Sequence, residues 1–296
     1  MHAGRRRSDV SHPILVQLAS ADAAVRRAGC LAAASDPAAT LLTEALCEAL
    51  GDRVRLVSRA ASDALVEIGH KHGDVDPGLR AALHGDEPVR RFGAAYTLAR
   101  ISPPSPRLLP ALVEALASAD GDVRWAATRI LVETGRMHGE VFPLLTGLVR
   151  GSESAMVRRM ATFALRELAP ERPEATSAIL AAASDRDLHV RRAALTALAS
   201  LIAPPASVGA HLLHTLAHDA DASSRRLAAL ALGELAAADP ASAPADTRAR
   251  LQNAAAGSSD ADLHRAIERA LARLSASETR SESARDGSAR AEPPKP

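Results

Sequence analysis

Arginine side chains and one tryptophan are spaced through this sequence in a way that points to binding chemistry. They stand two residues after eight apolar or small anchor residues, the first of which is Val25. The members of this row, called row two below, are Arg27, Arg59, Arg91, Trp125, Arg159, Arg192, Arg226 and Arg265. A guanidinium group presents a fork of N–H donors that matches a carboxylate or phosphate, and Trp and Arg are enriched at binding hot spots. Row two therefore predicts a binding surface with Trp125 as its one break.

More side chains of the same kinds lie near that break. Six residues after their anchors stand Arg129 and Phe163, and Arg166 stands nine residues after its anchor. If these positions share the outward face with row two, two of the chain's five aromatic rings stand among arginines. We expect Trp125, Phe163 and the arginines beside them to form the centre of the site.

Helices must position these residues, because each anchor opens a phrase with helical periodicity. The anchors are Val25, Val57, Val89, Val123, Val157, Val190, Ser224 and Leu263, at intervals of 32 to 39 residues. Apolar or small residues follow at positions three, four, seven, eight and eleven, which is one face of an α-helix. An Asp usually precedes the anchor by three residues and can cap the helix: Asp22, Asp86, Asp120, Asp187, Asp221 and Asp260.

One phrase departs from the pattern. In the third repeat the leucine expected at position eight is Thr97, and Leu98 follows one residue late. The sequence therefore predicts that this helix is locally overwound or shifted.

Second helices lie between the phrases, for example at 39–50, 107–118 and 209–219, with Pro and Gly at the joins. Each helix pair is too small to bury its own apolar face, so stacked pairs must share one continuous core. The chain is rich in Ala and Leu and only 2% aromatic, which suits closely packed helices. An all-α solenoid of about eight repeats is the predicted fold.

The phrase D-x-x-V-R-x-x-A-x-x-x-A-L-x-x-L resembles the short bacterial HEAT repeats first described in phycobilisome lyases, over roughly residues 12–275. The resemblance implies a right-handed solenoid of two-helix repeats whose second helices line a concave groove. It also implies an adaptor, because the family consists mostly of adaptors with a few enzymes. We expect a disordered N-terminal arm at 1–9, the solenoid at 10–275 and a disordered polar tail at 276–296.

The basic residues one position after the anchors have a structural interpretation. This row, called row one, comprises Arg26, Ser58, Arg90, Arg124, Arg158, Arg191, Arg225 and His264. We expect its arginines to pair with the capping aspartates four residues earlier, or to form an Asp–Arg ladder between repeats.

Metal and enzyme chemistry find little support in the residues. His211, His214 and His218 share one helical face and are weak candidates for metal ligands, so we expect no metal and no cofactor. The sequence contains no P-loop, dinucleotide glycine fingerprint, His-Glu-x-x-His motif, nucleophile elbow or Cys-x-x-Cys motif. The HEAT-repeat deoxyhypusine hydroxylases hold iron through repeated His-Glu pairs. No His in this sequence is directly followed by Glu, which argues against that subfamily.

Composition bounds the setting of the protein. The formal net charge is +1, so bulk charge demands no nucleic-acid or membrane partner. Two cysteines, no apolar run long enough for a membrane span and no signal-peptide pattern favour a cytoplasmic protein.

The sequence thus favours a non-catalytic interaction scaffold that binds a protein or peptide, acidic in character, in an Arg-lined groove. The alternative is a nucleic-acid-binding or base-repair protein of the HEAT-like glycosylase type that uses the same groove. A lyase-type enzyme is the third interpretation.

Overall fold

The computed structural model of the chain is all-helical, and it describes residues 12–73, 75–169, 174–201, 204–239 and 243–289, with side chains to residue 280. These residues contain sixteen α-helices and no strand. The first eight helices are α1 (Pro13–Leu18), α2 (Ala23–Ala33), α3 (Thr43–Ala49), α4 (Arg55–His72), α5 (Asp76–Leu83), α6 (Pro88–Ile101), α7 (Leu109–Ala115) and α8 (Gly121–Met137). The remaining eight are α9 (Val141–Gly151), α10 (Ala155–Leu168), α11 (Ala175–Ala182), α12 (Leu188–Leu198), α13 (Ala206–His218), α14 (Ala222–Ala238), α15 (Thr247–Ala256) and α16 (Ala261–Ala289).

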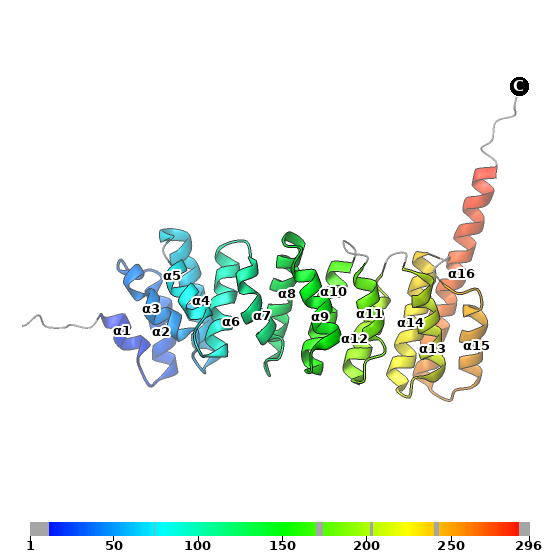
Figure 1. Cartoon of the computed structure of the whole chain (residues 1–296), viewed down its shortest axis with the longest axis horizontal. Helices are drawn as coiled ribbons and strands as arrows, with labels where there is room; N and C mark the ends of the chain where they lie inside the picture. Colours follow the sequence, from blue (N-terminus) through cyan, green and yellow to red (C-terminus); the bar gives the residue numbers. More distant parts are fainter. Residues whose placement is uncertain (1–11, 74, 170–173, 202–203, 240–242, 290–296) are drawn as a thin grey trace, which may run out of the picture. The chain divides into compact units, whose positions relative to one another are not determined.

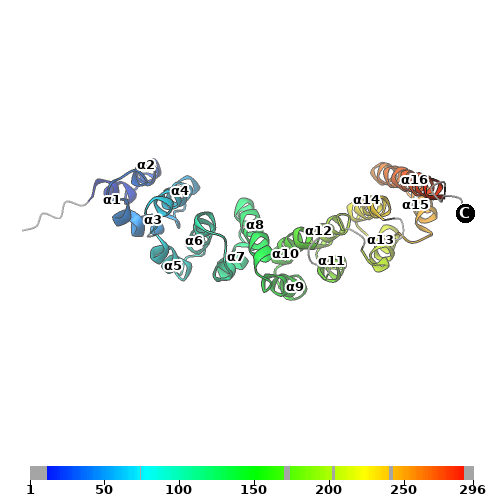
Figure 2. The ribbon, with the colours of Figure 1, turned by 90° about the horizontal axis from the view of Figure 1, so that it is seen from above.

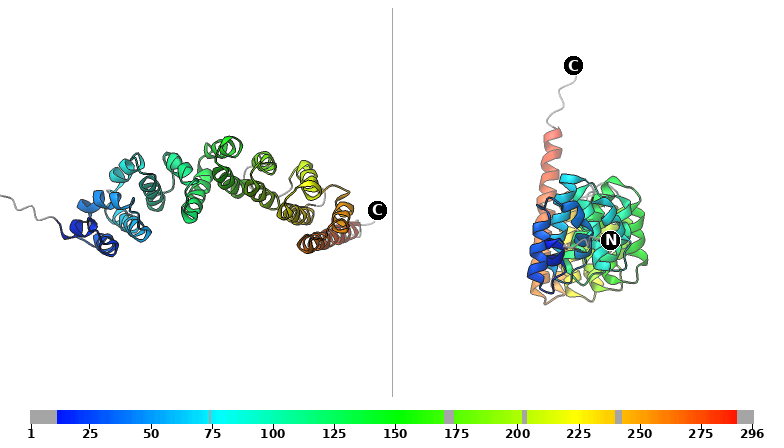
Figure 3. Two further views of the ribbon diagram at one scale, coloured as in Figure 1. Left: turned by 90° about the horizontal axis from the view of Figure 1, so that it is seen from below. Right: turned by 90° about the vertical axis from the view of Figure 1, so that its left-hand side faces the viewer.

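The helices form two compact units, one up to His138 and one from Gly139 onward. The sequence predicts a single array over residues 10–275, because the repeat pattern runs through residues 138 and 139 without interruption. Within each unit the even-numbered helices form one row and the odd-numbered helices a second (Figures 2 and 3). This is the predicted solenoid of helix pairs, in which the recurring phrases form the even-numbered helices.

Asp and Ser side chains start most even-numbered helices. Asp22, Asp120, Asp187 and Asp221 are the N-cap residues of α2, α8, α12 and α14, and each accepts a backbone N–H of its helix. Such caps satisfy N–H groups that the first turn leaves without partners, and each contributes about 1 kcal/mol. The capping role predicted for these aspartates is confirmed.

Alanine and leucine fill the interior. Leu65, Leu112 and Leu131 in the first unit are fully buried, as are Leu165 and Leu232 in the second. Burial of one leucine side chain is worth about 1.5–3 kcal/mol. Alanines between the leucines let neighbouring helix axes approach closely. At the closest such approach, a Cβ on Gly233 of α14 would lie 2.7 Å from the Cα of Ala270 on α16.

The end of α16 differs from the sequence expectation of a disordered tail from residue 276. The helix continues to Ala289 and extends past the other helices of its unit (Figure 1). Packing explains the first part of this extension, because Ser277 is buried and its hydroxyl donates to the carbonyl of Ala236 on α14 at 2.8 Å. Arg248 of α15 adds an ion pair with Glu278 at 2.6 Å. The predicted N-terminal arm at 1–9 and the last seven residues of the tail lie outside the described residues.

Candidate binding site on helices α4, α6 and α8

Three row-one arginines, Arg26, Arg158 and Arg191, tie neighbouring repeats together. Arg158 of α10 donates from Nε and Nη2 to the carboxylate of Asp185 at 2.7 and 2.8 Å. Its Nη1 donates to the carbonyls of Ser152 and Glu153, and the residue is only 5% exposed. Burial works to raise the pKa of Asp185, but the hydrogen bonds from Arg158 and from the Asp187 N–H outweigh it, so the pKa lies below its usual range.

An Arg–Asp pair of this kind between neighbouring repeats, called a rung below, recurs twice. Arg26 pairs with Asp52 at 2.6 Å, and Arg191 pairs with Asp219 at 3.2 Å. The aspartates stand five residues before the next anchor, not three, and each also accepts the backbone N–H two residues on. Of the two arrangements expected for row one, the structure thus contains the ladder between repeats.

Helix α6 is shifted by one residue relative to the repeat. Val89, the apparent anchor, is 58% exposed, while Ala94, Thr97 and Leu98 are buried. Arg91 donates from Nη1 to the carbonyl of Gly85, six residues earlier. Arg158 makes the same contact six residues back, to Ser152. Arg91 therefore occupies row one of the third repeat, and the anchor position falls on Arg90.

Two contacts explain the shift. Leu98 supplies the core leucine, and the hydroxyl of the buried Thr97 bonds with the carbonyl of Gly93 at 2.7 Å and with Ser62 of α4 at 2.9 Å. The N-cap is Glu87 in place of the predicted Asp86, again one residue later. Of the two alternatives for this helix, the shift is the one observed: its register relative to the repeat is displaced by one residue.

The shift turns two aromatic rings outward. Phe92 and Tyr96, which the unshifted phrase places at core positions three and seven, take positions two and six and are half-buried. Their ring centroids lie 6.0 Å apart, and the guanidinium carbon of Arg100 lies 5.5 Å from the Tyr96 centroid. Arg91 leaves row two and pairs with Glu114 of α7 at 2.6 Å. In the first unit, row two thus comprises Arg27, Arg59, Phe92 and Trp125, in that order.

A cavity of about 320 Å³ opens over this face of α6. Its lining comprises Leu50, Asp52, Arg53, Arg55, Ser58, Arg59, Ser62, Val89, Phe92, Gly93, Tyr96, Ser118, Asp120, Asp122, Val123 and Ala126. Gly93 lets α6 approach the end of α3, since a Cβ there would lie 2.9 Å from the Cβ of Leu50. Sequence reasoning missed this site because it assigned Phe92 and Tyr96 to the core. The late Leu98 was the available signal.

An ion-pair bridge crosses the cavity from α4 to α8. Arg55 of α4 pairs with Asp120 at 3.3 Å and with Asp122 of α8. The hydrogen bond from Arg55 lowers the pKa of Asp122, and the same bond raises the pKa of Arg55. Arg59, 60% exposed, approaches Asp122 only to 3.7 Å. Arg53 is exposed and makes no hydrogen bond or contact ion pair with any described residue.

Trp125 is 50% exposed and belongs to the first unit, at the row-two position of α8. Phe163, Arg159 and Arg166 belong to α10 of the second unit. There the guanidinium carbons of Arg159 and Arg166 lie 5.7 and 5.8 Å from the centroid of Phe163. The residues of the predicted cluster thus come from both units, and its α10 members lie together around the ring of Phe163.

Carboxylates neutralise much of row two in the second unit. Arg192 donates to both oxygens of Asp221, at 3.0 and 2.7 Å, and these bonds hold the pKa of Asp221 well below its usual range. Arg226 and Arg265 both pair with Asp262. Arg27 and Arg129, both in the first unit, make no hydrogen bond or contact ion pair with a described residue. Three arginines of the predicted stripe, Arg192, Arg226 and Arg265, are therefore already paired with acids.

The three histidines of α13 do not converge on one point. The rings of His214 and His218 lie 4.8 Å apart between centroids, with their planes tilted by 52°. His211 is half-buried, burial lowers its pKa, and its Nε2 makes no hydrogen bond with a described residue. Asp219 is held by Arg191. Within the described residues no group of three or more His, Cys, Asp or Glu side chains is arranged to hold a metal ion.

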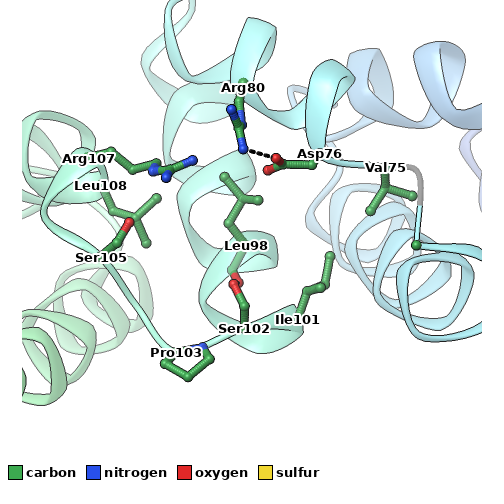
Figure 4. Close-up of a pocket in the computed structure, with 11 residues that line it drawn as sticks. Val75, Asp76, Arg80, Leu98, Ile101, Ser102, Pro103, Ser105, Arg107 and Leu108 are labelled. Atoms are coloured by element: carbon green, nitrogen blue, oxygen red, sulfur yellow. Dashed lines mark hydrogen bonds and ion pairs between the residues drawn. The ribbon is translucent and has the colours of Figure 1, made fainter.

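A second cavity in the first unit, of about 350 Å³, lies where α6 ends and the segment leading to α7 begins (Figure 4). In this view Arg80 reaches down from above Leu98, and Arg107 reaches in from the left. Arg80 is paired with Asp76, and the lining contains no aromatic ring. The cavity over α6, lined by the half-buried rings of Phe92 and Tyr96, is the stronger candidate for a binding site.

Comparisons with known proteins support the fold. The structure resembles the X-ray structure of the Escherichia coli protein YibA, with a TM-score of 0.53 and 18% identity over 88% of this chain and 91% of that chain. It also matches the crystal structure of an engineered protein, with a TM-score of 0.43 and 21% identity over 88% and 77% of the two chains. No curated protein sequence matches significantly.

The likeness to YibA shows the fold alone. No helix of the described residues could cross a membrane, because none combines enough length with enough apolar content. The family model for HEAT repeats matches residues 77–166 and 141–233, which together make up more than half of the sequence. The chain belongs to the HEAT-repeat family.

Proposed function

We propose that the protein is a non-catalytic scaffold that binds a protein or peptide on the face formed by α4, α6 and α8. The cavity over Phe92 and Tyr96 is the observation that carries this proposal. Part of each half-buried ring is in contact with water. A partner that covered this apolar surface would gain about 25 cal/mol of binding free energy per Å². Val89 of α6 is exposed and lines the same cavity, and Trp125 is exposed on α8, the helix that contributes Val123 and Ala126 to the lining.

The family supports this class of function, because HEAT repeats generally mediate protein interactions. Rings and apolar side chains that stand exposed beside arginines are also the composition typical of binding hot spots. The remaining row-two arginines then serve as polar surroundings of an aromatic centre and not as a continuous basic groove.

Ion pairing favours a protein partner over nucleic acid. A phosphate backbone is held by cations that are free to replace its counterions. In the second unit Arg192, Arg226 and Arg265 already bind carboxylates. A phosphate would have to displace these acids, which lowers the gain from each contact.

A reducing compartment such as the cytoplasm suits this scaffold. Cys30 and Cys47 are both free and buried. Burial raises the pKa of Cys30 to about 11 and that of Cys47 to about 12. At neutral pH both side chains therefore remain unreactive thiols in the core.

Affinity capture from the native host tests the proposal. Wild-type protein is expected to retain one or a few proteins, and Phe92→Ala and Trp125→Ala are each expected to lose them. Leu41→Ala is the matched control, since Leu41 is 78% exposed but lies outside the even-numbered row. Circular dichroism checks that all three variants keep the wild-type helix signal.

Capture that the double variant Phe92→Ala/Trp125→Ala leaves intact would contradict the proposal. Binding of arbitrary duplex DNA, with an affinity that falls linearly in log[salt], would favour the nucleic-acid alternative. A hot-spot interface should instead tolerate salt and select its partner.

A further inference from the structure

The charges around the cavity over α6 are not balanced. Asp120 and Asp122 are its acids on α8, and Arg55 already engages both. Asp52, the third acid of the lining, is occupied by Arg26 at 2.6 Å. Each carboxylate of the cavity therefore has a cation against it.

Two arginines of its lining are available. Among the described residues, Arg53 has no contact ion pair and Arg59 has only the loose 3.7 Å approach to Asp122. Arg129, exposed on α8 one turn after Trp125, likewise makes no hydrogen bond or contact ion pair with a described residue. A basic ligand would have to displace Arg55 from two aspartates, whereas an acidic ligand would find three arginines ready to pair.

The apolar floor of the cavity fits one large side chain. Its volume of about 320 Å³ lies at the lower end of the range of ligand pockets, too small to enclose a cofactor of ordinary size. Val89, Phe92 and Tyr96 provide a surface on which a further ring can stack edge to face or offset.

Residues 1–11 and 281–296 contain no Phe, Tyr or Trp, so these two segments do not supply that ring.

We propose that the occupant of the cavity is a linear segment of a partner protein in which an aromatic residue is flanked by acidic residues. The ring lies on Phe92 and Tyr96, and the flanking carboxylates pair with Arg53 and Arg59 on one side and Arg129 on the other. This inference rests on the proposed scaffold function and names the chemistry of its partner.

Selection from a library of random peptides displayed on phage tests the inference. The full-length protein is the target, and the Phe92→Ala variant is used to remove peptides that bind elsewhere. Peptides that combine Phe, Tyr or Trp with neighbouring Asp or Glu are expected to be enriched. Enrichment of basic or purely aliphatic peptides, or no enrichment over Phe92→Ala, would overturn the inference.

Charge reversal tests the acidic part separately. A selected peptide is titrated against the protein with Trp125 fluorescence as the signal, because the chain has a single Trp. Arg53→Glu/Arg59→Glu is expected to weaken binding by roughly ten-fold, since two exposed attractions become repulsions. The control Arg107→Glu, an exposed arginine that lines the second cavity, should leave affinity unchanged. Equal affinity for the double variant and wild type would contradict the acidic requirement.

The two proposals fail in different ways. If capture from host extract depends on Phe92 while the selected peptides lack acidic residues, the scaffold function stands and the inference is wrong. If capture is independent of Phe92 and Trp125, the scaffold function at this face is wrong as well.

Discussion

Helices α10, α12 and α14 of the second unit and helices α4, α6 and α8 of the first use the same phrase in different ways. In the second unit, Arg158 and Arg191 each bind an aspartate of the next repeat and the carbonyls before their own helix. In the first unit, Ser58 replaces the row-one arginine of α4, and Ser118 stands where α8 would need the rung aspartate. Because no rung forms there, arginines and aspartates bridge α4 to α8 over a cavity.

This difference separates repeats that stack through Arg–Asp pairs from repeats that carry the proposed binding face. In a rung, an arginine of one repeat and an aspartate of the next neutralise each other. The pair also holds the start of the next helix in place, because the aspartate accepts a backbone N–H just before that helix. Where the rung is missing, α6 shifts by one residue and presents Phe92 and Tyr96 to solvent. We infer that the binding face arises where the ladder is interrupted.

The largest expected effect follows removal of a rung. Arg158→Ala leaves Asp185, whose side chain is 10% exposed, without its cation, and leaves the carbonyls of Ser152 and Glu153 without a donor. Loss of one partner of a buried pair costs about 3–5 kcal/mol. Urea unfolding followed by circular dichroism measures the loss in free energy of unfolding.

The neighbouring Arg159→Ala is the matched control for that change. Arg159 touches only the face of Phe163 in the described contacts, so its removal should cost less than about 1 kcal/mol. Equal losses for the two variants would mean that the ladder does not distinguish row one from row two.

A smaller effect is expected where α6 meets α3. Gly93→Ala places a methyl group 2.9 Å from the Cβ of Leu50 and 3.2 Å from its carbonyl oxygen. Backbone movement to relieve such overpacking costs about 1–3 kcal/mol, more than the roughly 1 kcal/mol that Ala gains in helix propensity. Thermal unfolding measures the change, and Gly147→Ala, with open space around it, is the control. A Gly93→Ala protein as stable as wild type would show that the close approach does not hold α6 in place.

Sequence patterns predicted the stacking but not the cavity, and α6 shows why. Apolar spacing and capping residues act within about one turn, so the helices and most caps could be predicted from neighbouring letters. The register of α6 depends on long-range contacts, the hydrogen bond of Thr97 to Ser62 and the approach of Gly93 to Leu50. The residues Val89-Arg90-Arg91 match the repeat phrase, although the register of α6 lies one residue later.

The sequence predicts the positions of the row-two arginines but not their ion-pair partners, because these partners also depend on long-range contacts. These arginines recur as expected, but the acids that neutralise them, such as Asp221 and Asp262, lie one repeat further along the chain. Pairing across repeats depends on how the helices stack, which spacing alone does not determine.

Acid should weaken the second unit through the pair of Arg192 and Asp221. Hydrogen bonds from Arg192 lower the folded-state pKa of Asp221, so its contribution to stability is present above the unfolded pKa of about 3.9 and is lost as the pH falls below that value. Asp221→Asn removes this titration and should cost about 1 kcal/mol at neutral pH. Arg192→Ala should flatten the dependence of unfolding free energy on pH in the same region. An unchanged acid slope in both variants would contradict the assignment.

The smallest effect is expected at the rim of the cavity, and it decides whether the comparison holds. Arg59→Ala removes a side chain that is 60% exposed and whose only ion pair is the 3.7 Å approach to Asp122. Surface substitutions of this kind change stability by no more than about 0.5 kcal/mol. Arg192→Ala, at the same row-two position, should cost more because it breaks two hydrogen bonds to Asp221. A large loss at Arg59 would make the rim of the cavity a structural rung like those of the second unit, whereas a small loss with weakened partner capture would assign Arg59 to binding.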